Sequence, residues 1–253
     1  MAPARPPRPR LVRPKEIPRI SDSPLPKPMY LLHNLAHIEL NAIDLAWDTV
    51  VRFSHMRLQN DFYGDFARVA DDESRHFGWC LQRMAECGHG YGDMDAHDML
   101  WDSALKSKSD LCARLAIIPM SQEARGLDAG PRLVRKLTGL CDVRSSKIVA
   151  RIAQEEKAHV AVGVAWFTRV CDALGEDPGC VFRAELAALC PDLLKGPFNH
   201  EAREEVGLQR GWYDRGSWVD GSDGGGGLDE DALCTLRQRL GQILEVEMPH
   251  ACS

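Results

Sequence analysis

The chain has 253 residues, 44% of them hydrophobic, which is ordinary for a globular protein with a buried core. Its 37 acidic and 31 basic residues give a formal net charge of −6, so the chain has no bulk attraction to nucleic acids or anionic membranes. Nine scattered cysteines without a C-x-x-C pair, and no apolar run of membrane-spanning length, predict a cytoplasmic protein without disulfides.

Residues 1–28 are rich in proline and arginine and predict an extended arm. Nine prolines in this segment forbid a continuous helix. They also disfavour the amphipathic helix of a mitochondrial presequence, and the lack of an apolar stretch disfavours a secretory signal. The arm is expected to lie on the following domain or to be disordered.

An all-α bundle domain is predicted over residues 29–215. Apolar residues recur every three to four positions over 29–53 and 61–87, which indicates a hairpin of two amphipathic helices. The glycine- and aspartate-rich residues 88–101 predict a long crossover loop. A third helix is expected over 103–127 with a kink at Pro119, and a fourth over 144–173 after a short connection at 137–143.

Further segments follow the fourth helix. A shorter helix is expected over about 180–190. Residues 216–253 are expected to form a linker, with the glycine run Gly224–Gly227, and then a weakly amphipathic helix around 229–246. This last helix is predicted to dock on the bundle or on a partner.

Two copies of one motif occupy the expected apolar faces of the second and fourth helices. Glu73 and His76 are three residues apart, as are Glu156 and His159. Residues at i and i+3 share one side of a helix, so each pair can present an oxygen and a nitrogen to one point. Two other Glu-x-x-His sequences, at 86–89 and 247–250, are interrupted by a glycine and a proline and are treated as coincidence.

A single glutamate precedes each motif by a similar distance. Glu39 lies 34 residues before Glu73, and Glu123 lies 33 residues before Glu156. The repeated spacing predicts two helical hairpins that each supply Glu and then Glu-x-x-His. This is the ligand pattern of ferritin-like di-iron and di-manganese carboxylate bundles, so the expected fold is a ferritin-like four-helix bundle with a long crossover.

The alternative interpretation is a set of buried salt bridges. Arg75, Arg125 and Arg151 lie near these glutamates in sequence and could pair with them. However, four carboxylates that converge in one core are costly to bury, and two divalent cations would neutralise them. The mixed oxygen and nitrogen ligands, without cysteine, favour iron, manganese or a mixed Mn/Fe pair over zinc. The predicted metal ligands are Glu39, Glu73, His76, Glu123, Glu156 and His159.

Several neighbouring residues have open or structural assignments. Asp72 and Asp128 are candidates to accept hydrogen bonds from the ligands, although a solvated surface role is equally compatible with the sequence. Asp71 and Glu155 are expected to face outward, and His37 to be structural. In residues 197–207, Phe198, Asn199, His200 and Arg203 are expected either to cover the metal pocket or to cap the bundle by packing.

With these residues in hand, the chain resembles a ferritin-like family known only as domain of unknown function 455. The resemblance covers roughly residues 8–207 and includes FYGDFARVADDESRHF, IIPMSQEARGLDAGP, IVARIAQEEKAHVAVGVAWF and PFNHEAREEVG. It implies a ferritin-like bundle with the six ligands above and implies no particular reaction. More distantly, the ligand pattern is similar to that of tRNA-modifying hydroxylases and other di-iron oxygenases.

The leading functional hypothesis is an O2-activating di-iron oxidase or oxygenase that acts on an unknown substrate and draws on an external electron donor. Alternatives are an iron-handling ferroxidase or storage protein, and a metal-stabilised scaffold without catalysis. The acidic chain argues against a nucleic-acid partner, although the arginine-rich arm could contact phosphate. No membrane association is expected, and a homodimer is compatible with the sequence.

Overall fold

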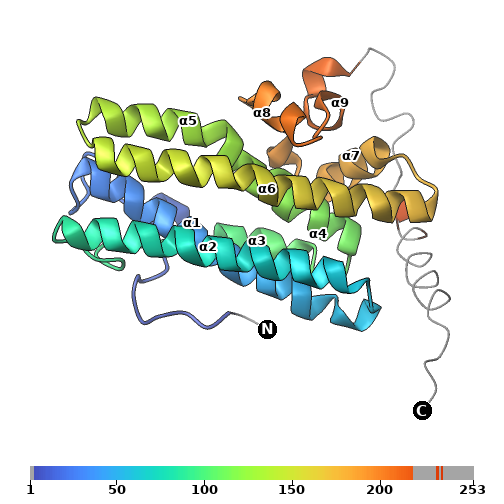
Figure 1. Cartoon of the computed structure of the whole chain (residues 1–253), viewed down its shortest axis with the longest axis horizontal. Coiled ribbons are helices and arrows are strands. Elements are labelled where there is room, and N and C mark those ends of the chain that lie inside the picture. Colours follow the sequence, from blue (N-terminus) through green and yellow to red (C-terminus); the bar gives the residue numbers. More distant parts are fainter. Residues whose placement is uncertain (1–2, 219–231, 234, 236–253) are drawn as a thin grey trace.

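The computed structural model describes residues 3–218 together with residues 232, 233 and 235, and this part of the chain is a helical bundle without a β-strand (Figure 1). Two long helices, α1 and α2, pack side by side as one hairpin, and α5 packs along α6 as a second. The long helices are α1 (Lys27–Arg52), α2 (Asn60–Glu86), α5 (Ala124–Gly139) and α6 (Val143–Leu174). The predicted C-terminal helix at 229–246 lies almost entirely outside the described residues.

Shorter elements complete the described fold. The helices α3 and α4 lie behind the long pairs in Figure 1, whereas α7, α8 and α9 gather beside one end of α6. Their bounds are α3 (Met99–Lys106), α4 (Leu111–Ile117), α7 (Pro178–Leu189), α8 (His200–Glu205) and α9 (Arg210–Tyr213). Single 3₁₀ turns occur at η1 (Pro14–Glu16), η2 (Ser54–Met56), η4 (Pro191–Leu194) and η5 (Arg215–Ser217). Within the described part, no helix has the length and apolarity needed to cross a bilayer.

The helices predicted over 29–53, 61–87 and 144–173 are confirmed, each with ends within two residues of those observed. The single third helix predicted over 103–127 is wrong, because the chain turns between α3 and α4. Asp110 caps α4 by accepting a hydrogen bond from the Ala113 N–H at 3.0 Å. The buried Arg114 then donates to Ser107 Oγ and to the Ala104 carbonyl, which fixes the turn.

The predicted loop and connection boundaries also need correction. The crossover ends earlier than expected, since α3 begins at Met99, and α5 continues to Gly139 rather than ending near 127. Between α4 and α5 the chain forms a π-helical segment, η3 (Ile118–Glu123), in place of a simple kink at Pro119. Proline has no N–H to donate to a helical ladder, and π-helical turns inside α-helices are frequent at functional sites.

The N-terminal arm lies along the bundle and the crossover. The Val12 N–H donates to the Ala96 carbonyl at 2.8 Å, and the Ala96 N–H donates to the Arg10 carbonyl at 3.0 Å. Further along α1, Arg5 pairs with Asp44 and donates to Asn41 Oδ1 at 2.6 Å. These contacts give the extended arm a defined position without a helix.

The buried apolar side chains form two main clusters along the bundle. One includes Leu32, Met84 and Val149, and the other, larger cluster includes Phe62 and Phe167. In α1, α2 and α6, the predicted ligands lie between residues of the two clusters, next to a small third group of Ala46, Val69 and Ala70. The bundle therefore holds a polar layer between two apolar ones.

A close helix contact near this layer gives a first prediction. A Cβ built on Gly163 of α6 would lie 2.5 Å from Pro119 Cβ, whereas one built on Gly78 of α2 would meet nothing within 4 Å. Gly163→Ala should therefore lower the free energy of unfolding by about 1–3 kcal/mol through overpacking. Gly78→Ala, the matched control, should raise it by about 0.5–1 kcal/mol because alanine favours a helix. Denaturant unfolding at constant metal content tests this, and shifts in the same direction would contradict it.

Candidate metal centre

The structure brings all six predicted side chains together in the middle of the bundle. They form two overlapping groups, and within each group one potential ligand atom per residue lies within 4.8 Å of the others. The first group comprises Glu39, Glu73, His76 and Glu156, and the second comprises Glu73, Glu123, Glu156 and His159. Glu73 and Glu156 belong to both groups. This buried acidic and histidine cluster could hold metal ions.

Four helical segments supply the cluster. Glu39 projects from α1, the Glu73 and His76 pair from α2, Glu123 from the last position of the π-helix, and the Glu156 pair from α6. In this cluster only Glu123 is partly exposed as a residue, and the exposed fractions of Glu39, Glu73 and His76 are 2%, 1% and 0%. Ionised carboxyl groups at such depth require compensation by protons or cations.

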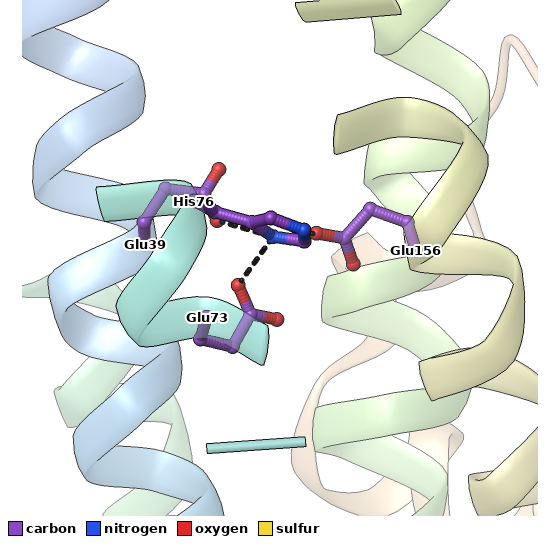
Figure 2. Close-up of side chains that lie close together, drawn as sticks. All are labelled: Glu39, Glu73, His76 and Glu156. Atoms are coloured by element: carbon purple, nitrogen blue, oxygen red, sulfur yellow. Dashed lines mark hydrogen bonds and ion pairs between the residues drawn. The ribbon is translucent and has the colours of Figure 1, made fainter. Parts of the chain in front are cut away.

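Figure 2 shows the carboxyl groups of Glu39, Glu73 and Glu156 close to the ring of His76. Its Nδ1 lies 3.2 Å from Glu73 Oε2, 3.4 Å from Glu39 Oε2 and 3.5 Å from Glu156 Oε1. One N–H can make a full hydrogen bond to only one of these oxygens. The convergence therefore exceeds what hydrogen bonding to His76 can satisfy.

Unpaired atoms elsewhere in the cluster also indicate that hydrogen bonds alone do not satisfy these side chains. Glu73 Oε1, Glu123 Oε2 and His159 Nδ1 are buried and have no hydrogen-bond partner. His159 Nδ1 lies 2.9 Å from Glu73 Oε1, but the pair does not have hydrogen-bonding geometry. Buried polar atoms are nearly always satisfied, so these three suit a cation that would accept electron pairs from all of them.

Burial shifts the protonation of the cluster when no cation is present. It raises the pKa of Glu39 well above its usual range and the pKa of Glu123 to about 8, with the neighbouring carboxylates adding to the effect. Burial lowers the pKa of the two histidines, but the surrounding carboxylates outweigh it. They raise the pKa of His76 and of His159 to about 12.

These shifts predict that metal binding depends strongly on pH. Groups with a pKa above the solution pH hold protons, and a cation must displace them. At about pH 6, loading two divalent ions should therefore release about four protons, two from imidazolium groups and two from Glu39 and Glu123. The affinity for the metal ions should rise as the pH rises, because fewer protons then compete with the cations for the ligands. Titration in weak buffer measures the release, and an affinity that falls with pH would contradict the prediction.

The second nitrogen of each histidine is held by an acid on the opposite helix. His76 Nε2 of α2 lies 3.0 Å from Glu155 Oε2 of α6, and His159 Nε2 of α6 lies 3.3 Å from Asp72 Oδ2 of α2. Arg75 pairs with both acids and lies 3.3 Å from Glu155. Such hydrogen bonds fix a ring so that its Nδ1 faces the cluster.

This arrangement corrects one prediction and resolves another. Glu155 was expected to face outward, which is wrong, since its side chain is only 17% exposed and bonds His76. Asp71 does face solvent as predicted, whereas Asp72 has the ligand-supporting position rather than the purely solvated one. The sequence held a usable signal, because an acidic residue directly precedes each motif glutamate.

Residues 197–207 pack against α5 and α9, and Glu205 pairs with Lys157 of α6. Arg203 forms a buried ion pair with Asp128 of α5, with Nη2 2.7 Å from Oδ2, and its guanidinium stacks 4.7 Å from the Phe198 ring. Asn199 also donates its N–H to Asp128 Oδ1 at 2.8 Å. His200 Nδ1 lies 3.0 Å from the Tyr213 hydroxyl. The structure therefore favours the interpretation that this segment caps the bundle by packing. Asp128 holds the segment in place rather than supporting a metal ligand.

Comparison with known proteins places the chain among uncharacterised relatives. The family described as "Protein of unknown function (DUF455)" matches residues 1–214. An "Uncharacterized protein" of Haemophilus influenzae is 34% identical over 208 residues, which cover 80% of this chain and 72% of that protein. No solved structure matches the chain significantly. The chain thus belongs to the DUF455 family of proteins of unknown function.

Proposed function

We propose that the protein is a ferritin-like dinuclear metal protein in which Glu73 and Glu156 would help to hold both cations. The observation that carries the proposal is the pair of overlapping four-residue groups that share these two glutamates. Glu39 and His76 would complete one coordination sphere, and Glu123 and His159 the other. A single Glu from each of two helices and Glu-x-x-His from each of the other two is the ligand arrangement of di-iron and di-manganese carboxylate bundles.

Iron is the metal that this ligand set supports best, with manganese or a mixed pair as close alternatives. Carboxylate oxygens with one imidazole per ion suit these metals better than zinc, which favours thiolates and imidazoles in closed four-coordinate sites. The carboxylates of Glu155 and Asp72 would keep each Nε2 protonated and each Nδ1 free to bind. The two apolar clusters would limit the access of bulk water to the centre.

The reaction we propose is O2 activation in an oxidase or oxygenase that acts on an unknown substrate. Bound in the ferrous state, an iron pair supplies electrons that reduce dioxygen. The chain itself would position the ions between two apolar layers and hold the ligating rings through Asp72, Glu155 and Arg75.

Anaerobic loading of metal-free protein with ferrous ions, followed by mixing with O2, tests this function. An enzyme of the proposed kind should bind two ions per chain, consume O2 and need an external reductant for further turnover. Accumulation of ferric iron well beyond two ions per chain would instead support iron storage. Binding of two ions without any reaction with O2 would support a metal-stabilised scaffold.

A further inference from the structure

A separate groove lies between α2 and α6, on the outer side of the helix pair that carries both Glu-x-x-His motifs. The two helices pack against each other and run side by side in Figure 1. The groove has a volume of about 350 Å³, which is within the range of small-molecule sites. None of the six candidate metal ligands lines it.

Basic side chains dominate the polar lining of this groove. Arg144, Lys147 and Arg151 are exposed and follow one another at spacings of three and four residues, so they share one face of α6. Arg83 of α2 faces them, and Glu86 is the one carboxylate in the lining. Two more carboxylates adjoin the lining, since Arg83 pairs with Asp142 and Arg151 with Glu155. Four cations therefore meet three carboxylates, which leaves a small local excess of positive charge on a chain of net charge −6.

The cations differ in how firmly they are already engaged. Arg144 pairs with Glu86, and Arg151 with Glu155, and both arginine side chains are more than half exposed. Exposed ion pairs contribute little to stability, so these arginines can exchange a carboxylate for a phosphate. Among the described residues, Lys147 forms no ion pair and so provides the uncompensated charge of the groove.

An aromatic surface lies beside these charges. Trp79 of α2 lines the groove, and its ring centroid is 5.4 Å from that of His76. The guanidinium of Arg75 lies 5.5 Å from the Trp79 ring. A tryptophan next to several cations is the combination that binds a planar aromatic group through stacking and its phosphate through charge.

We infer that this groove binds a nucleotide-type ligand, with its ring system against Trp79 and its phosphate on Lys147, Arg144 and Arg151. The inference does not rest on the proposed metal chemistry, since the groove is lined by other residues. The ring system of a ligand bound there would be separated from the candidate metal cluster by one side chain, because Trp79 contacts His76.

Fluorescence titration of the full-length, metal-free protein with flavin mononucleotide tests the inference. Riboflavin, which has the same ring without the phosphate, is expected to bind about tenfold more weakly or worse. AMP should displace the flavin, because it also combines an aromatic base with a phosphate. High salt should weaken binding of the phosphorylated ligands.

Two variants locate the site. Lys147→Glu should weaken flavin mononucleotide binding about tenfold or more, because the new carboxylate repels phosphate and pairs with the flanking arginines. Lys136→Glu, the same change at an exposed residue of α5 outside the groove lining, should leave binding unchanged. Trp79→Leu should also weaken binding about tenfold, whereas Trp79→Phe, which keeps an aromatic face, should lose less.

Several outcomes would overturn the inference. They are equal binding of riboflavin and flavin mononucleotide, failure of AMP to compete, equal effects of the two lysine variants, and no binding at all. Circular dichroism and unfolding temperature serve as folding controls for each variant. Metal content after loading, measured separately, shows whether a Trp79 variant disturbs His76, so failure of the groove and failure of the metal centre are distinguishable.

Discussion

Replacing Glu73 or Glu156 with alanine is expected to abolish binding of both metal ions, whereas replacing Glu39 or Glu123 should remove one. The first two residues belong to both groups of converging atoms, and the other two belong to one group each. Loss of a shared carboxylate removes a ligand and a negative charge from both positions at once. Metal analysis of protein from its native host, expressed as ions per chain, measures the difference.

The matched control is Asp71→Ala. Asp71 lies on the same helix as Glu73, two residues away, and faces solvent, so its loss should leave two ions per chain. A metal-free chain that lacks one of the four clustered carboxyls should still fold, because the buried histidines can release a proton when a carboxylate partner is lost. Circular dichroism checks this point. Full occupancy in Glu73→Ala or Glu156→Ala, or an equal partial loss in all four variants, would contradict the arrangement in which these two glutamates help to hold both ions.

Much of the fold was predictable because the long helices carry a regular apolar period. The stripes that include Leu32 and Phe62 recur every three to four residues, and the helices that contain them end close to the predicted positions. The convergence of the six cluster residues was also predictable. Glu39 and Glu123 precede their Glu-x-x-His motifs by nearly the same number of residues, so two similar hairpins place all six side chains at the same height along the bundle.

Other features depend on contacts between distant residues and leave a weaker trace in the sequence. The break between α3 and α4 is fixed by the buried Arg114, which bonds the Ala104 carbonyl ten residues earlier. In the sequence, the polar residues around Arg114 fit the exposed face of one continuous helix equally well. Glu155 seemed to face outward because a helical wheel does not show that His76 of another helix comes within 3.0 Å. Predicting contacts between side chains of different helices requires the angle at which the helices pack, and the apolar period of a single helix does not provide that angle.

The packing of residues 197–207 was likewise open from sequence alone, and it leads to a second large effect. Asp128 and Arg203 are 75 residues apart, and their side chains are 1% and 2% exposed. Arg203 Nε also donates to Asp128 Oδ1 at 2.9 Å, so the pair is bidentate. Asp128→Ala leaves the guanidinium buried without its carboxylate. The free energy of unfolding should therefore fall by about 3–5 kcal/mol.

The exposed pair of Lys195 and Asp192 is the matched control, since those side chains are 73% and 86% exposed. Asp192→Ala should change stability by about 0–1 kcal/mol, because solvent screens a surface ion pair. The double variant Asp128→Leu with Arg203→Met should recover part of the loss, since two apolar side chains leave no buried charge. Denaturant unfolding measures all three variants. If Asp128→Ala lowers the free energy of unfolding no more than Asp192→Ala does, the packing role is contradicted. A loss of bound metal in Asp128→Ala without destabilisation would instead support the alternative that residues 197–207 cover the metal pocket.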